Sequence, residues 1–193
     1  MPTAVQPAVA PGVRSAPRAA AVPLVAAALF LSALLLFAVQ PMFTKMVLPV
    51  LGGSPAVWSI ALVFFQALLL AGYCYAHLLA RYASTGAALA LHLALMLGAG
   101  LTLPMAIPAG WTSAPADGEA FWLLGLFAAS VGLPFFALAA NGPLLQAWFS
   151  RSGHPRAADP YFLYAASNLG SLLGLIAYPA LTAPRTPALA TSA

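Results

Sequence analysis

Long stretches without a charged side chain most constrain what this chain can fold into. Its seven Lys and Arg and three Asp and Glu leave five uncharged stretches, at residues 19–44, 46–80, 82–116, 120–150 and 160–184. Each stretch is long enough for one membrane-spanning helix, which needs about 20 consecutive apolar residues. The sequence therefore predicts an all-α integral membrane protein with five transmembrane helices.

The composition also indicates that lipid surrounds the helices. Hydrophobic residues make up 63% of the chain and charged residues 5%, whereas roughly a quarter of the residues in a soluble domain are charged. So few polar side chains cannot cover a soluble core, and the expected surroundings are a lipid bilayer. The net charge of +4 does not predict a nucleic-acid partner, because the basic residues are scattered rather than gathered on one face.

The predicted transmembrane domain covers residues 21–182, with a disordered tail rich in Ala and Pro on each side, at residues 1–20 and 183–193. Its helices are expected at about residues 23–40, 55–79, 85–103, 121–148 and 161–178. The alternative for the first helix is a secretory signal, but the apolar run is long for a signal core and no convincing cleavage site precedes Gln40.

Prolines raise two questions about these helices. Residues 42–48, between Pro41 and Pro49, either continue the first helix beyond a kink or lie in the interface with Lys45 reaching water. The fourth helix is longer than a straight crossing needs, and Pro134 and Pro143 within it predict a kink.

The basic residues predict the orientation, because Lys and Arg concentrate in short cytoplasmic loops. With the amino terminus in the cytoplasm, the inner side carries Arg14, Arg18, Arg81, Arg151 and Arg156, and the outer side carries Lys45 and Arg185. The expected location is the inner (cytoplasmic) membrane. Five crossings then place the carboxyl terminus outside.

No catalytic, cofactor or metal site is predicted. His77 and His92 fall on separate predicted helices and His154 in a loop, without Cys or carboxylate at ligand spacing. The single Cys74 excludes an internal disulfide and is expected to be a small buried apolar residue.

Uncharged polar residues inside the predicted helices are the candidate functional groups. At 100° per residue, one stripe of the second helix carries Ser59, Gln66, Tyr73 and His77, and one stripe of the fifth carries Tyr164, Asn168, Ser171 and Tyr178. With Asn141 and Gln146 of the fourth helix, these residues either line a solute path or cavity, or form interhelical hydrogen bonds. Ser167, Gly170 and Gly174 form a small-residue face suited to close helix packing.

Four runs carry a family resemblance: QPMFTKMVLPVLGGSPAVW at Gln40–Trp58, GLPFF at Gly132–Phe136, PLLQAWF at Pro143–Phe149 and DPYFLYAASNLGSLLGL at Asp159–Leu175. Over about Ala28–Pro179 the chain resembles the amino-terminal membrane part of bacterial fused major facilitator and spermidine-synthase-like proteins. The resemblance implies an arrangement like an incomplete amino-terminal half of a major facilitator transporter, with a cytoplasmic amino terminus.

Full-length members of that family also carry a soluble aminopropyltransferase-like domain. This chain has three acidic residues, none in the context that such chemistry needs, so no enzymatic activity is expected of the chain alone. The ending TAPRTPALATSA departs from the family pattern, which favours a truncated product over a genuine stand-alone subunit.

Three functions follow as expectations. The first is the membrane domain of a spermidine-synthase-like fusion protein, acting as an anchor or as part of a transport path. The second is a small oligomeric transporter or exporter, and the third is a non-functional membrane fragment. Expected partners are further membrane helices, from a second copy or another chain, and a soluble spermidine-synthase-like domain.

Overall fold

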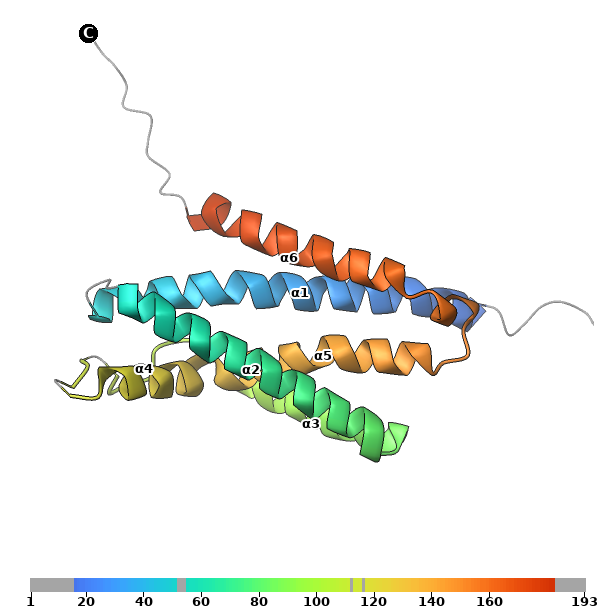
Figure 1. Ribbon diagram of the computed structural model, residues 1–193, viewed down its shortest axis with the longest axis horizontal. Coiled ribbons are helices and arrows are strands. Elements are labelled where there is room, and N and C mark those ends of the chain that lie inside the picture. Colours follow the sequence, from blue (N-terminus) through green and yellow to red (C-terminus); the bar gives the residue numbers. More distant parts are fainter. Residues whose placement is uncertain (1–15, 52–54, 112, 116, 183–193) are drawn as a thin grey trace, which may run out of the picture.

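The computed structural model describes residues 16–51, 55–111, 113–115 and 117–182. All regular structure in these ranges is helical, which confirms the all-α prediction (Figure 1). The elements are α1 (Ala16–Leu51), α2 (Pro55–Tyr82), α3 (Thr85–Leu101), α4 (Glu119–Phe127), the π-helical turn η1 (Ala128–Gly132), α5 (Leu133–Ser150), the 3-10 turn η2 (Pro155–Ala158) and α6 (Tyr161–Thr182).

Four of the described helices are long and apolar enough to cross a membrane, over Ala21–Pro49, Pro55–Tyr82, Glu119–Ser150 and Tyr161–Ala180. The third of these combines α4, η1 and α5. Helix α3 is also apolar but has 17 residues, or ~26 Å of helix at 1.5 Å per residue, slightly less than the hydrocarbon core. Large apolar side chains such as Leu70, Leu97 and Phe121 are 64%, 72% and 82% exposed, as lipid-facing residues are.

Helix α1 lies between two layers of the bundle. Helix α6 packs along one side of it and α5 along the other, and α2 and α3 pack against α5 (Figure 1). Five rings, from Phe43, Phe64, Phe65, Phe127 and Phe135, form a phenylalanine cluster where α1, α2, α4 and the start of α5 meet. Its ring centroids are 4.8 to 5.6 Å apart, so aromatic packing closes this end of the bundle.

Two glycines of α6 allow its close contact with α1. A Cβ atom at Gly174 would lie 2.6 Å from the carbonyl oxygen of Leu34, and one at Gly170 would overlap the carbonyl oxygen of Phe30. Small residues let helix backbones approach in this way.

The first helix differs from its predicted bounds at both ends. It does not stop near Gln40 but continues to Leu51, so the chain takes the first of the two predicted alternatives for residues 42–48. Each proline removes only one helical hydrogen bond, and the extension places Phe43 and Val47, which are 2% and 0% exposed, in the core. Burial of these side chains offsets the lost bonds.

Other boundaries also shift. Residues 16–20, predicted as part of a disordered tail, are helical, and the last helix runs past Tyr178 to Thr182. Residues 1–15 and 183–193 of the predicted tails lie outside the described residues. The irregularity predicted for the fourth helix is the π-helical turn η1, which ends at Gly132, two residues before Pro134. A missing backbone donor is a common cause of such irregularity.

Basic side chains make contacts near the helix ends at two places. The guanidinium Nη1 of Arg151 donates to the carbonyl oxygen of Ala80 at 2.7 Å, which joins the carboxyl-terminal ends of α2 and α5. At the carboxyl-terminal ends of α1 and α6, Lys45 Nζ lies 5.9 Å from the ring centroid of Tyr178. The cytoplasmic side of the bundle is a prediction from sequence.

Candidate functional site

A cavity of about 290 Å³ lies between α1, α2, α5 and α6, and we call it the polar cavity. Its lining includes five polar side chains, Ser32, Tyr73, Gln146, Tyr164 and Ser167. Tyr73 and Tyr164 are 47% and 51% exposed, so the cavity reaches the surface of the bundle beside these two rings. Hydroxyls and one side-chain amide are thus gathered in an otherwise apolar bundle.

The backbone adds an acceptor to the polar cavity. Pro143 has no N–H, so the carbonyl of Ala139 lacks the donor that a helix normally supplies four residues later. Both residues line the cavity. A freed carbonyl in the membrane needs water, a polar side chain or a ligand as its partner, and the cavity supplies the space for one.

Close packing of α2 on α5 brings Tyr73 to the polar cavity. A Cβ atom at the preceding residue, Gly72, would lie 2.8 Å from the Cβ atom of Ala139 and 3.1 Å from the backbone nitrogen of Ala140. No larger residue fits there without moving one helix. The glycine therefore sets the distance at which the Tyr73 ring meets the cavity wall.

One hydrogen bond connects α1 and α5 beside the polar cavity. The side-chain nitrogen Nδ2 of Asn141 donates to Oγ of Ser32 at 2.6 Å. Ser32 is 5% exposed and belongs to the cavity lining. Asn141 thus makes an interhelical hydrogen bond, the second of the two uses that the sequence left open, and it reaches the cavity through Ser32.

The structure brings only some of the predicted residues into the polar cavity. Tyr73 and Tyr164 line it. Gln66, His77 and Asn168 are exposed on the outside of the bundle. They lie on the same helical stripes as the two tyrosines, so they extend the polar stripes of α2 and α6 along the surface of the bundle. We call these three residues the outer polar surface.

The remaining predicted residues have structural contacts. The hydroxyl of Ser171 donates to the carbonyl oxygen of Ser167, one turn earlier in α6, at 3.0 Å. Gly170 and Gly174 lie against α1 as described above. Cys74, expected to be buried, is exposed, because its face of α2 meets no other described helix.

Sequence reasoning missed Ser32. The hydroxyl is the single polar group within a long apolar run, so helical periodicity gave no signal for it. Ser167 was placed on the packing face of its helix, yet it also lines the polar cavity. Both assignments depend on which neighbours the helix meets, and a single helix does not contain that information.

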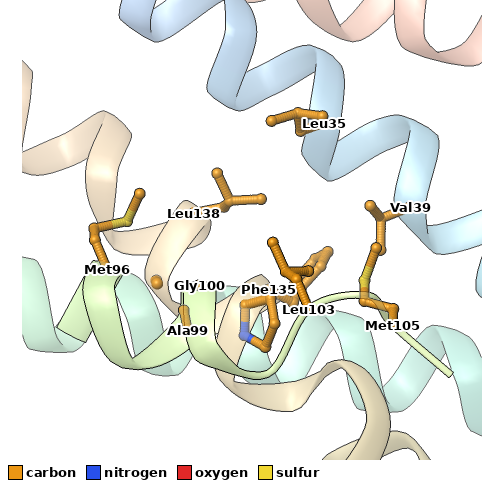
Figure 2. A pocket seen from close by; sticks show the side chains of 11 residues that line it. Leu35, Val39, Met96, Ala99, Gly100, Leu103, Met105, Phe135 and Leu138 are labelled. Atoms are coloured by element: carbon orange, nitrogen blue, oxygen red, sulfur yellow. The ribbon is translucent and has the colours of Figure 1, made fainter.

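A second cavity differs in chemistry. It has a volume of about 340 Å³ and lies between α1, α3 and α5. Figure 2 shows Leu35 and Val39 of α1 above it and Phe135 and Leu138 of α5 with Leu103 on its other side. Its lining has no polar side chain, so it suits an acyl chain or apolar side chains and not a polar solute.

Within the described residues, no three His, Cys, Asp or Glu side chains come together as a metal site would need.

A comparison of the chain with known protein families, with curated proteins and with solved structures finds no match. The polar cavity and the resemblance in the four sequence runs are therefore the basis for a functional proposal.

Proposed function

We propose that this chain is the membrane domain of a spermidine-synthase-like fusion protein and forms part of a path for a polar solute. The polar cavity carries the proposal. A domain that served only as an anchor would have no use for five polar side chains and a freed carbonyl around one cavity, because unpaired polar groups in the membrane cost free energy.

The outer polar surface supports a path that continues into other protein. Gln66, His77 and Asn168 are exposed on the bundle, and polar side chains that face lipid are costly. Water or a second protein surface that covers them removes this cost. We therefore expect further membrane helices, from the same protein or from a second copy, to face α2 and α6 and to complete the path.

The position of the cavity along α1 suggests which side of the membrane it opens to. Cavity residues Leu29 and Ser32 precede Phe43 of the phenylalanine cluster on this helix. With a cytoplasmic amino terminus, the cavity lies in the cytoplasmic half of the bundle, and the phenylalanine cluster fills the outer half. This arrangement corresponds to a path open to the cytoplasm and closed on the outside.

The lining also indicates the class of solute. Phenols, hydroxyls and one amide line the polar cavity, and none of its described lining residues is Asp, Glu, Lys or Arg. Such a site recognises its ligand by hydrogen bonds and contact with aromatic rings. We expect a small solute rich in hydrogen-bonding groups.

Cysteine labelling tests whether the polar cavity contains water. Both variants are made in the full chain with Cys74→Ser. Ser167→Cys places a thiol in the polar cavity. Leu172→Cys is the control, because this residue of the same helix is 53% exposed and lies outside the cavity lining. A charged, membrane-impermeant thiol reagent reacts with the thiolate, which forms only in contact with water.

We expect the reagent to modify Ser167→Cys in vesicles that expose the cytoplasmic side, and to leave Leu172→Cys unmodified. Equal resistance of both thiols would mean that the cavity is dry, and the solute path would have to be abandoned.

The link to a soluble aminopropyltransferase-like domain depends on the resemblance, and co-purification of such a domain with this chain tests it separately.

A further inference from the structure

His92 is a buried titratable side chain to which the solute path assigns no role. It lies in α3 and is 3% exposed. Neither Nδ1 nor Nε2 has a hydrogen-bond partner within the described structure. A polar ring buried in this way costs free energy, and an ionisable group within a membrane-spanning bundle points to function.

The neighbours of His92 come from α2 and α5, the helices that pack against α3. The ring centroid of Tyr75 lies 6.2 Å from that of His92, and the ring centroid of Trp148 lies 6.4 Å from it. The polar neighbour is Asn141, whose side chain interacts with the imidazole, although the contact lacks full hydrogen-bond geometry. Tyr75 is the one titratable group among these neighbours, and none of them carries a formal charge.

Asn141 connects His92 with the polar cavity. Its Nδ2 donates to Oγ of Ser32 at 2.6 Å, and Ser32 lines the cavity. The same amide has an oxygen, Oδ1, that accepts hydrogen bonds. In this orientation, with nitrogen toward Ser32, Oδ1 is the atom of the amide left to accept a hydrogen bond, although neither ring nitrogen of His92 forms one in this structure.

We propose that His92 is a proton-binding site within the membrane and that Asn141 and Ser32 connect it to the polar cavity. The lone pair of the unprotonated ring nitrogen takes a proton from water, and the new N–H donates to Oδ1 of Asn141. The positive charge is stabilised by its hydrogen bond to this oxygen.

Protonation fixes the direction of the hydrogen bonds. Both nitrogens of a charged imidazole are donors, so Asn141 must present its oxygen to the ring and its nitrogen to Ser32. The Ser32 hydroxyl then donates into the polar cavity. An unprotonated ring either donates or accepts, so the amide is free to turn over and Ser32 takes either role. The effect of this change at Ser32 on a solute in the polar cavity rests on the proposed function. Proton binding by His92 does not.

Trp148 provides a built-in reporter of the charge on His92. A protonated imidazole quenches the fluorescence of a nearby indole more strongly than a neutral one. We would titrate the full chain in lipid nanodiscs from about pH 8 to about pH 5, the range in which histidines change charge. Because the chain has four Trp, the difference between wild type and Trp148→Phe isolates the relevant signal.

We expect this Trp148 signal to fall as the pH is lowered, to lose its pH dependence in His92→Gln, and to keep it in the control variants His77→Gln and His154→Gln. Asn141→Leu removes the acceptor for the new N–H and should weaken proton binding roughly tenfold, so that a more acidic pH is needed. A purely structural role of Asn141 would not move the titration.

A Trp148 titration that persists in His92→Gln, or one that does not move in Asn141→Leu, would overturn the proposal. If His92→Gln does not fold, ¹⁵N-histidine spectra of the wild type report His92 directly, and the two control variants assign its signal. A His92 signal that does not change across this pH range would also overturn the proposal. Labelling of Ser167→Cys is independent of this outcome, so failure of the proton site and failure of the solute path are distinguishable.

Discussion

The contact of α6 with α1 leads to a quantitative prediction for Gly174→Ala. The new Cβ atom would lie 2.6 Å from the carbonyl oxygen of Leu34 and 3.3 Å from the backbone nitrogen of Ala38. Carbon and oxygen approach no closer than about 3.3 Å even in weak hydrogen bonds, so the helices must separate by about 0.7 Å. The obstacle is backbone, and no side-chain rotation relieves it.

A gap of this size removes roughly a quarter to a half of the dispersion energy of each contact that it opens. Overpacking of this kind costs about 1–3 kcal/mol. Alanine recovers about 1 kcal/mol because it favours a helix more than glycine does. We therefore expect Gly174→Ala to lower the free energy of unfolding by up to about 2 kcal/mol, and to displace Tyr164 and Ser167 from the polar cavity.

Reversible unfolding in mixed micelles of mild detergent and sodium dodecyl sulfate, followed by circular dichroism, measures this free energy. Gly100→Ala on α3 is the matched control, because a Cβ atom there meets nothing within 4 Å. The control should be unchanged or gain up to about 1 kcal/mol. If both variants change stability alike, the close contact between α1 and α6 does not stabilise the bundle, and our reasoning fails.

Three further substitutions are tested in the same unfolding assay. Gly72→Ala places a Cβ atom 2.8 Å from that of Ala139 and forces α2 from α5, which should cost up to about 2 kcal/mol after the gain in helix propensity. Ser32→Ala removes the acceptor of the 2.6 Å bond from Asn141 and should cost about 1–3 kcal/mol, much of it recovered when Asn141→Leu is added. Phe127→Ala empties the middle of the phenylalanine cluster, where the ring is 0% exposed, and should cost about 3–5 kcal/mol.

The charge pattern predicted the helical class correctly because it reflects a requirement that applies to each segment by itself. A helix in lipid must lack charged side chains over its crossing length, and this can be read without knowing its neighbours. The helix ends were less accurate. Pro41 was expected to end or kink α1, but the core contacts of Phe43 and Val47 carry the helix on to Leu51, and these contacts come from other segments.

The polar cavity, too, depends partly on single helices and partly on contacts between them. Helical periodicity placed Tyr73 and Tyr164 on polar stripes, and both line the polar cavity. The same stripes also contain Gln66 and Asn168, which are exposed on the bundle. A stripe specifies a direction around one helix, whereas a cavity needs several helices whose stripes converge.

The sequence by itself therefore determined that this protein is a bundle of apolar helices and which residues could be polar inside it. Only the tertiary structure decided that Ser32 joins the polar cavity, that Asn141 connects α1 and α5, and that the ring nitrogens of His92 are buried without a hydrogen bond. The physical reason is that charge and periodicity are properties of one segment. The contacts of a buried polar group depend on how closely separate helices approach, and glycines such as Gly72 and Gly174 set that distance.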